Sequence, residues 1–284
     1  MTPLTVPVRA CPMCGSFRRL RFVEKDGGRY VRCRSCATIY SDPRPNDDVL
    51  LSRLNDFAPP PLDGNGRAGA VAAEQWKLDL LAGLPLPGPR LLDVGAGTGA
   101  FVAAAVAAGY EAEGQDLAPA VAAAAHRDFD VHVHGVPVRD LEGTYDLVTV
   151  WDTLEHVTDP PALLRDVARL LVPGGHLVAL SPHADGLSGR LLKGRWWVFG
   201  PADHLVMFSV AALTQAIELA GLKAGRVFTR QLAPPYPPHA ADPDRAAMRV
   251  FHWLDRRPRA QAFLVDHDLG DWILATAGKR APLS

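Results

Sequence analysis

Apolar runs and amphipathic segments alternate along the chain from Arg90 to its C-terminal end. Segments with helical periodicity lie between runs of strand length. This alternation predicts an α/β fold with a doubly wound, mostly parallel seven-stranded sheet covered by helices on both faces. We expect the last strand to insert antiparallel. The expected strands are Arg90–Val94, Tyr110–Gln115, Val131–His134, Tyr145–Trp151, His176–Ser181, Leu222–Thr229 and Asp271–Ala277, and the expected helices are one ending at Ala108, Pro119–Arg127, Pro160–Leu171 and Val210–Ala220.

The pattern before Arg90 divides the chain further. Proline and glycine clusters at 59–61 and 64–66 mark a linker, and Ala68–Leu84 has the pattern of a helix that ends before three closely spaced prolines. We therefore predict a small module in residues 1–46, a linker with a helical cap in 47–88 and a large domain in 89–284. Insertions are expected at about 182–208 and 233–268, the second with a helix around Asp244–Leu254.

Composition and charge narrow the class of protein. The chain has 284 residues, of which 48% are hydrophobic, enough for a substantial core. Lys and Arg total 30 against 31 for Asp and Glu, so no overall positive field would attract nucleic acid or an anionic membrane. No apolar run reaches the roughly 18 residues that a membrane-spanning helix needs. We expect a cytoplasmic protein, monomeric or homodimeric, that binds neither nucleic acid nor membrane.

The four cysteines all lie in the first module, as Cys11-x2-Cys14 and Cys33-x2-Cys36. Two such pairs can supply four thiolates to one tetrahedral, closed Zn²⁺ site of the structural kind. The alternative is a pair of disulfides, which a chain without a secretion signal is not expected to keep. The spacing therefore predicts a zinc ribbon.

The ribbon is also rich in arginine. Between Arg9 and Arg34 the basic residues face only two acids, Glu24 and Asp26. These arginines could contact RNA or a phosphorylated substrate, or they could form the solvated surface of a small module. The second interpretation is favoured because no series of stacking aromatic residues accompanies the charges.

A glycine-rich turn follows the first strand of the large domain. Gly95, Gly97 and Gly99 separate the apolar run Leu91–Val94 from an alanine-rich helical segment. Glycines let the backbone approach a ligand closely, and the first N–H groups of the helix would face it. A carboxylate, ribose or phosphate is expected there, although the turn alone also fits a loose dinucleotide-binding pattern.

Five motifs together resemble one family. They occur in the order found in class I S-adenosylmethionine-dependent methyltransferases, and the similarity runs from about Trp76 to Lys279. A nicotinamide-dependent enzyme has no reason to place Pro-Gly-Gly before the fifth strand. The motifs are Leu92–Phe101, Gly114–Pro119, Tyr145–Val148, Leu154–Pro160 and Leu171–Gly175.

The resemblance implies S-adenosyl-L-methionine as the cofactor. The loop Gly95, Ala96, Gly97 and Gly99 would meet its methionine part, and Asp93 would orient the loop or accept from the ammonium group. Asp116 ends the second strand, where a carboxylate can accept both ribose hydroxyls. The alternative role of Asp116 is a helix N-cap. Leu117 would cover the adenine, Asp140 could accept from its amino group, and Trp151 and Asp152 would border the methionine tail.

Methyl transfer requires positioning and, for many acceptors, a base. Asp152, Glu155 and His156 would share one face if their segment is helical. This layout resembles O-methyltransferases of the quinone-biosynthesis type, some of which hold a divalent metal at these positions. The alternative is that Glu155 and His156 only brace the loop.

His204 is the other candidate base. It follows Trp196-Trp197 in the segment after the fifth strand, where related enzymes fold a lid over the acceptor. Near its reference pKa of roughly 6.5 it would be mostly neutral at pH 7. A structural histidine is the alternative, and His183 has a similar but weaker claim.

These features predict a methyltransferase that acts on an oxygen or carbon of a small molecule in natural-product or sugar biosynthesis. The ribbon joined to this domain resembles a bacterial group that includes nucleotide-sugar C-methyltransferases, in which the zinc module helps to form the acceptor side. One alternative is an rRNA base methyltransferase that binds RNA through the ribbon. The other is a non-catalytic scaffold that binds a partner through it.

Overall fold

The main sheet of the protein has seven strands in the order β12-β13-β10-β9-β6-β7-β8. The computed structural model describes residues 4–25, 27–56, 58–200, 203–230 and 256–280, with residues 249 and 253. Only β13 runs antiparallel to its neighbours, β10 and β12, which confirms the predicted sheet and the inserted last strand. The strands are β6 (Arg90–Val94), β7 (Glu111–Gln115), β8 (Val133–His134), β9 (Tyr145–Trp151), β10 (Leu171–Pro182), β12 (Lys223–Arg230) and β13 (Trp272–Gly278).

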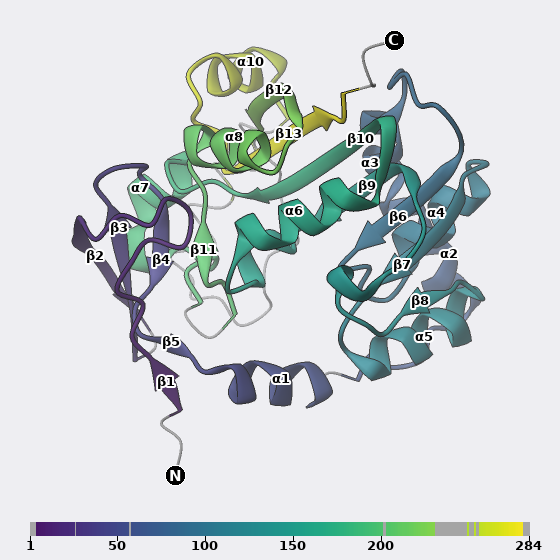
Figure 1. Ribbon diagram of the computed structural model, residues 1–284, viewed down its shortest axis with the longest axis horizontal. Coiled ribbons are helices and arrows are strands. Elements are labelled where there is room, and N and C mark those ends of the chain that lie inside the picture. The colour runs from purple at the N-terminus through teal and green to yellow at the C-terminus, as the bar shows by residue number, and fades with distance from the viewer. Residues whose placement is uncertain are drawn as a thin grey trace.

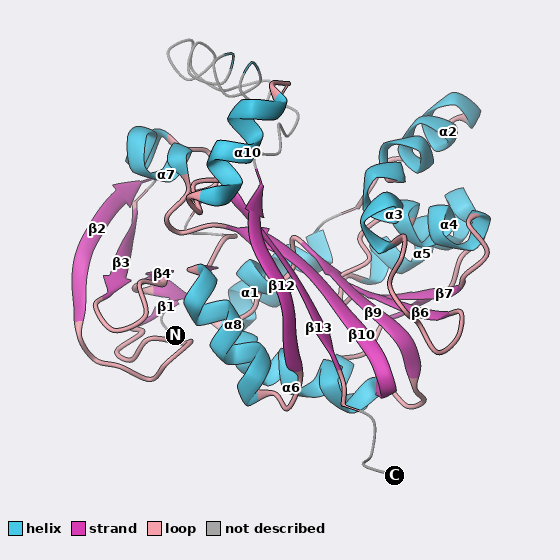
Figure 2. Ribbon diagram, turned by 90° about the horizontal axis from the view of Figure 1, so that it is seen from above, coloured by secondary structure: helices cyan, strands magenta, loops and turns pink. Residues whose placement is uncertain are grey.

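Helices cover both faces of this sheet because successive strand residues point to opposite sides. Leu92 and Val148 pack with α6 and α8 on one face. Leu91 and Leu147 pack with α3 and α4 on the other. Figure 2 shows the two layers on either side of the strands. The helices are α3 (Gln75–Leu81), α4 (Ala100–Ala107), α5 (Pro119–Phe129), α6 (Pro160–Leu170) and α8 (Val210–Leu219).

The cap before β6 differs from the prediction. The single helix expected over Ala68–Leu84 is two helices, α2 (Gly64–Ala73) and α3, which meet at Glu74. The side chain of Asp63 accepts a hydrogen bond from the backbone N–H of Gly66, so α2 begins earlier than its apolar pattern suggests. The linker also contains a helix that was not predicted, α1 (Asp47–Asp56).

The N-terminal module, residues 4–46, shares a sheet with the large domain. Its strands β2 (Arg19–Lys25), β3 (Gly28–Cys33) and β4 (Ile39–Ser41) are joined by β11 (Val206–Met207), which comes from the segment after β10. Val206 pairs with Tyr40 and Met207 with Ile39. Figure 1 shows β11 beside β4. The module and the large domain are therefore joined by backbone hydrogen bonds.

The remaining elements are short. The strands β1 (Thr5–Val6) and β5 (Arg44–Pro45) pair with each other, and α7 (Leu187–Leu192) and α10 (Pro258–Asp266) flank the end of the sheet. The helix expected around Asp244–Leu254 lies, apart from residues 249 and 253, outside the described residues. Among the described helices, none is both long enough and apolar enough to span a bilayer.

Candidate active site

The turn between β6 and α4 is built on three glycines with positive φ. The φ angles of Gly95, Gly97 and Gly99 are 72°, 53° and 82°, a region that side chains with a Cβ rarely enter. A Cβ on Gly95 would lie 2.1 Å from Oγ1 of Thr153, whereas no atom lies within 4 Å of the equivalent point on Gly97. Gly95 is thus required for packing, and Gly97 leaves open space for a ligand beside the backbone.

Asp116 closes this turn from the end of β7. Its Oδ2 accepts a 3.0 Å hydrogen bond from the N–H of Gly97, and its Oδ1 accepts one of 2.9 Å from Ala118. The N-cap of α5 is Ala118, so Asp116 itself is not the capping residue. Burial raises the pKa of the carboxyl, and the hydrogen bonds from the backbone, which lower it, offset only part of this effect. Each oxygen keeps a lone pair that could accept from a ribose hydroxyl, and Leu117 beside it is 42% exposed.

Asp93 and Trp151 lie beneath the turn. Asp93 is buried, and its Oδ1 accepts a 2.7 Å hydrogen bond from Thr149 on β9. Desolvation raises the pKa of Asp93 to about 7. The ring of Trp151 packs 5.4 Å from that of Phe101 and 6.0 Å from that of Trp76. The hydrogen bond from Thr149 connects Asp93 to β9, and its role beside the glycine turn stays a prediction.

Lys77 on α3 was not among the predicted site residues. Its Nζ lies 5.8, 5.6 and 5.4 Å from the ring centroids of Trp76, Phe101 and Trp151 and 2.7 Å from Oε2 of Glu74. Rings at these distances stabilise a cation. The sequence pattern gave no sign of this group, because the three aromatic residues come from three different elements.

The expected common face of Asp152, Glu155 and His156 is not formed. Residues Leu154–His156 make a single 3-10 turn, and Asp152 precedes it with a φ of 46°. The carboxylate of Asp152 accepts from Nε1 of Trp272 at 3.1 Å, while buried Glu155 accepts from Ser181 at 2.9 Å. Three residues in a 3-10 turn cannot produce the i, i+4 geometry of an α-helix. The three side chains therefore point to different partners.

The carboxyl groups of Asp152 and Glu155 have raised pKa values. Asp152 is exposed at the surface, yet the protein around it raises its pKa to about 6 through desolvation. The pKa of Glu155 is raised well above its ordinary value, first by desolvation and then by the charge of Asp152. This pair therefore holds protons at a higher pH than ordinary surface carboxyls.

The residue that lies beside Glu155 and His156 is His204, and not Asp152 as expected. Ligand atoms of Glu155, His156 and His204 lie within 4.8 Å of one another, and the two imidazole rings are 4.8 Å apart. Nδ1 of His156 is 2.8 Å from the carbonyl oxygen of Asp203, and Nδ1 of His204 contacts that of Val198. Since a carbonyl can only accept, each Nδ1 carries the hydrogen. In the neutral rings, both Nε2 atoms keep a free lone pair.

The surroundings keep both rings neutral. Desolvation lowers the pKa of His156, and desolvation together with the charge of His156 lowers the pKa of His204 to about 4. The expectation that His204 titrates near its reference value is therefore wrong, because the ring is surrounded by protein. His183 is buried, with Nδ1 2.9 Å from the carbonyl oxygen of Gly270, which favours a structural role. Asp140 lies 3.9 Å from Arg139 on an exposed 3-10 turn, and its role stays a prediction.

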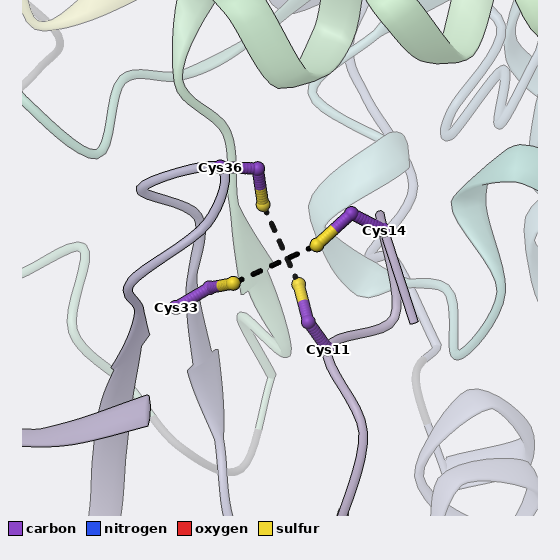
Figure 3. A group of neighbouring side chains, drawn as sticks. All are labelled: Cys11, Cys14, Cys33 and Cys36. Atoms are coloured by element: carbon purple, nitrogen blue, oxygen red, sulfur yellow. Dashed lines mark hydrogen bonds between the residues drawn. The ribbon is translucent and has the colours of Figure 1, made fainter. Parts of the chain in front are cut away.

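The four cysteines of the N-terminal module converge. Their Sγ atoms lie within 4.8 Å of one another, with Cys11 and Cys36 at 3.6 Å and Cys14 and Cys33 at 3.6 Å (Figure 3). None of them forms a disulfide. A tetrahedral zinc with bonds of about 2.3 Å requires sulfur atoms just under 4 Å apart. The cluster fits that geometry.

The module also contacts the segment that carries His204. Lys25 donates to the carbonyl of Trp196 at 2.9 Å, and Ser209 donates to the carbonyl of Cys36 at 2.7 Å. The N-terminal module thus contacts this segment at Trp196 and at Ser209, the second contact being made by a residue of the cysteine cluster.

Comparisons with known proteins agree with this geometry. Residues 67–225 match the model of a family described as "Methyltransferase domain". The ubiquinone biosynthesis O-methyltransferase of Bordetella avium is 40% identical over 165 residues, which cover 49% of this chain and 64% of that protein. The enzyme of the same name from Xanthomonas campestris is 39% identical over 111 residues, 36% of this chain and 46% of the relative. The chain thus spans about half the length of the curated relatives it matches.

Solved structures share the fold. A SAM-dependent methyltransferase from Thermotoga maritima, described as a possible histamine N-methyltransferase, matches with a TM-score of 0.51 at 18% identity, over 75% of this chain and 91% of that one. A methyltransferase from Mesorhizobium loti matches with a TM-score of 0.51 at 22% identity, over 74% of this chain and 100% of that one. The chain belongs to the methyltransferase domain family.

Proposed function

We propose that the protein methylates a hydroxyl oxygen of a small molecule and that His204 and His156 together accept the proton that this hydroxyl loses. The observation that carries the proposal is the pair of imidazoles whose Nδ1 atoms are held by carbonyls, which leaves a lone pair on each Nε2 of the neutral rings. A general base needs such a lone pair within reach of the acceptor.

The cofactor would be held on the other side of Asp152. The backbone of Gly95, Ala96, Gly97 and Gly99 would approach its methionine part, and Asp116 would accept from its ribose hydroxyls. Leu117 would cover the adenine, while Trp151 and Asp152 would border the methionine tail. The bound cofactor supplies an electrophilic methyl group on a sulfonium.

The residues of this chain then act on the acceptor. With the cofactor bound, the hydroxyl oxygen would take the methyl group that the sulfonium supplies, and the hydroxyl proton would pass to Nε2 of His204 or His156. Because the two rings are 4.8 Å apart, repulsion prevents both from holding an extra proton, so the pair transfers one proton per turnover.

A small acceptor agrees with the surroundings of the pair. Trp197 lies 6.2 Å from His204 and 6.3 Å from Trp272, measured between ring centroids. Indole rings provide large apolar surfaces for a small molecule. The name of the O-methyltransferase relatives supports an oxygen acceptor; a carbon acceptor and a product of natural-product or sugar biosynthesis stay predictions. The protein is proposed to act as a monomer or homodimer.

RNA is a weaker candidate for the acceptor. Several arginines of the N-terminal module form ion pairs within the protein: Arg19 and Arg29 share Asp42, at 2.9 and 3.4 Å, and Arg32 pairs with Asp185. Paired arginines of this kind stabilise the module and leave less charge for phosphates. We propose that the cysteine cluster holds one structural Zn²⁺, which fixes the segment carrying His204.

A divalent metal held by Glu155, His156 and His204 is a second candidate mechanism. The ligand atoms of these three residues lie within 4.8 Å of one another, which favours it. Such an ion would bind and acidify the acceptor hydroxyl. The two mechanisms differ in their response to EDTA: treatment that spares the zinc of the cysteine cluster should inhibit only an enzyme that needs this second ion.

The experiment that tests the function is methyl transfer from isotope-labelled S-adenosylmethionine. The purified protein is incubated with separate panels of phenols, sugar nucleotides and RNA, and the products are examined by mass spectrometry for a labelled methyl group on oxygen. The proposal expects label only in small molecules with a hydroxyl. Label in RNA alone, or on a carbon atom alone, would contradict the proposal.

A further inference from the structure

Two histidines and a glutamate gather at the edge of the main sheet, outside the active site. His134 ends β8, the edge strand, and His132 directly precedes this strand. Residues two apart in an extended chain share a face. Glu113 on the neighbouring β7 joins them, and ligand atoms of the three lie within 4.8 Å of one another. Figure 1 shows β8 beside β7, next to α5.

The hydrogen bonds fix how these rings are presented. Nε2 of His134 lies 3.0 Å from Oε2 of Glu113. A carboxylate only accepts, so Nε2 carries the hydrogen and Nδ1 of neutral His134 has the lone pair. That Nδ1 lies 3.3 Å from Nε2 of His132, and the two rings are nearly perpendicular, at 88°. A tetrahedral ion with bonds of about 2.0–2.1 Å needs nitrogen atoms about 3.3 Å apart.

Glu113 is itself held in place. Its Oε1 accepts a hydrogen bond from the hydroxyl of Tyr145. Burial raises the pKa of Glu113, but the hydrogen bonds from Tyr145 and His134 outweigh it, so the pKa is lowered and the group is an anion at neutral pH. A carboxylate behind a histidine is the usual outer support of a metal-binding imidazole.

We propose that Nε2 of His132 and Nδ1 of His134 bind a divalent transition metal of the Zn²⁺ or Ni²⁺ type, with Glu113 orienting His134 through Nε2. On binding, the hydrogen of neutral His132 moves from Nε2 to Nδ1 by exchange with solvent, and the ion takes its position between the two nitrogens, with water completing the coordination. Imidazole is a preferred ligand of these ions. His132 is exposed, so ions reach the site directly.

The test is calorimetric titration of the full-length, zinc-loaded protein with NiCl2. The wild-type protein should bind one equivalent of Ni²⁺ more than His132→Ala or His134→Ala. In Glu113→Gln this equivalent should bind about 10–100-fold more weakly, because the orienting charge is lost. His126→Ala is the matched control, since His126 is an exposed histidine on α5 outside the cluster, and its titration should equal that of the wild type.

Two results would overturn the proposal. One is a wild-type protein that binds no more Ni²⁺ than His132→Ala. The other is an equivalent of Ni²⁺ that still binds to His132→Ala and His134→Ala but no longer binds to His156→Ala. This result would assign the ion to the active-site histidines. His132→Gln keeps a hydrogen-bond donor toward His134, and it replaces the alanine variant where that variant does not fold.

Discussion

The hydroxyl of Tyr30, on β3 of the N-terminal module, donates a 2.7 Å hydrogen bond to the main-chain carbonyl of His204. Tyr30 is fully buried against Phe199, with the two ring centroids 5.2 Å apart. The module therefore fixes the backbone of a proposed catalytic residue that lies 174 positions later in the chain.

Tyr30→Phe tests this connection. The variant keeps the ring and its packing but leaves the carbonyl of His204 without this donor, which costs about 0.5–1.5 kcal/mol. We expect kcat to fall by up to about tenfold, with the affinity for S-adenosylmethionine unchanged. Calorimetry and initial rates give the two quantities. Tyr110→Phe, outside the module, is the control, and a Tyr30 variant that loses cofactor affinity would argue against a role limited to the acceptor side.

Removal of zinc should disturb the segment that carries His204. We expect one zinc per chain by elemental analysis, and we expect chelation to unfold the module while the large domain keeps its structure. Since β11 pairs with β4, turnover should fall although cofactor binding persists, and added zinc should restore it. Protein that contains no zinc when freshly purified, or that turns over normally after chelation, would refute this account of the module.

The fold was largely predictable, because strand and helix periodicities act over short distances. β6 and β9 begin and end at the predicted residues. The packing between distant segments was not predictable in this way. The strand β11 is only two residues long and pairs across the domains, and no local pattern shows that residues 206–207 would join β4.

The candidate site also has a part that was predictable from the sequence and a part that was not. The glycine turn and Asp116 are close in sequence and geometry, so their association follows from the motif. The grouping of Glu155, His156 and His204 depends on how the segment after β10 folds back. The 3-10 turn at Leu154–His156 also cannot be distinguished from an α-helical start by residue spacing alone.

Asp116→Ala should weaken cofactor binding. The change removes the acceptor for the ribose hydroxyls and also the bonds from Gly97 and Ala118, which should cost roughly 1–3 kcal/mol of binding free energy. Calorimetric titration with S-adenosylmethionine measures this. Glu142→Ala, an exposed acid on the same domain, should bind as the wild type does. Equal affinity in both variants would remove Asp116 from the cofactor site.

Asp93→Asn should change how stability depends on pH. The Asp93 carboxyl has an ordinary pKa of 3.8 and a pKa of about 7 in the folded protein, so the folded state keeps a proton that the unfolded state releases. This proton stabilises the folded state at low pH. The stabilisation is lost as the pH rises from 3.8 to about 7, and the loss in the free energy of unfolding is on the order of a few kcal/mol. Asparagine stays neutral at every pH. In urea unfolding, the stability of the variant relative to the wild type should therefore increase as the pH rises from 5 to 8. Parallel pH dependence of both proteins would contradict the raised pKa.

The most direct test of the proposed mechanism is the pH profile of kcat for His204→Gln and His156→Gln, measured together with cofactor affinity. In the wild type, turnover should fall as the pH drops through the lowered histidine pKa values, so the acidic limb should lie below about pH 6.5. Loss of the base should reduce kcat by about 10²–10⁴-fold in at least one variant, with S-adenosylmethionine bound as in the wild type and the limb shifted or absent. His126→Gln should behave as the wild type. Normal turnover and an unchanged acidic limb in both variants would contradict the assignment of this histidine pair as the base.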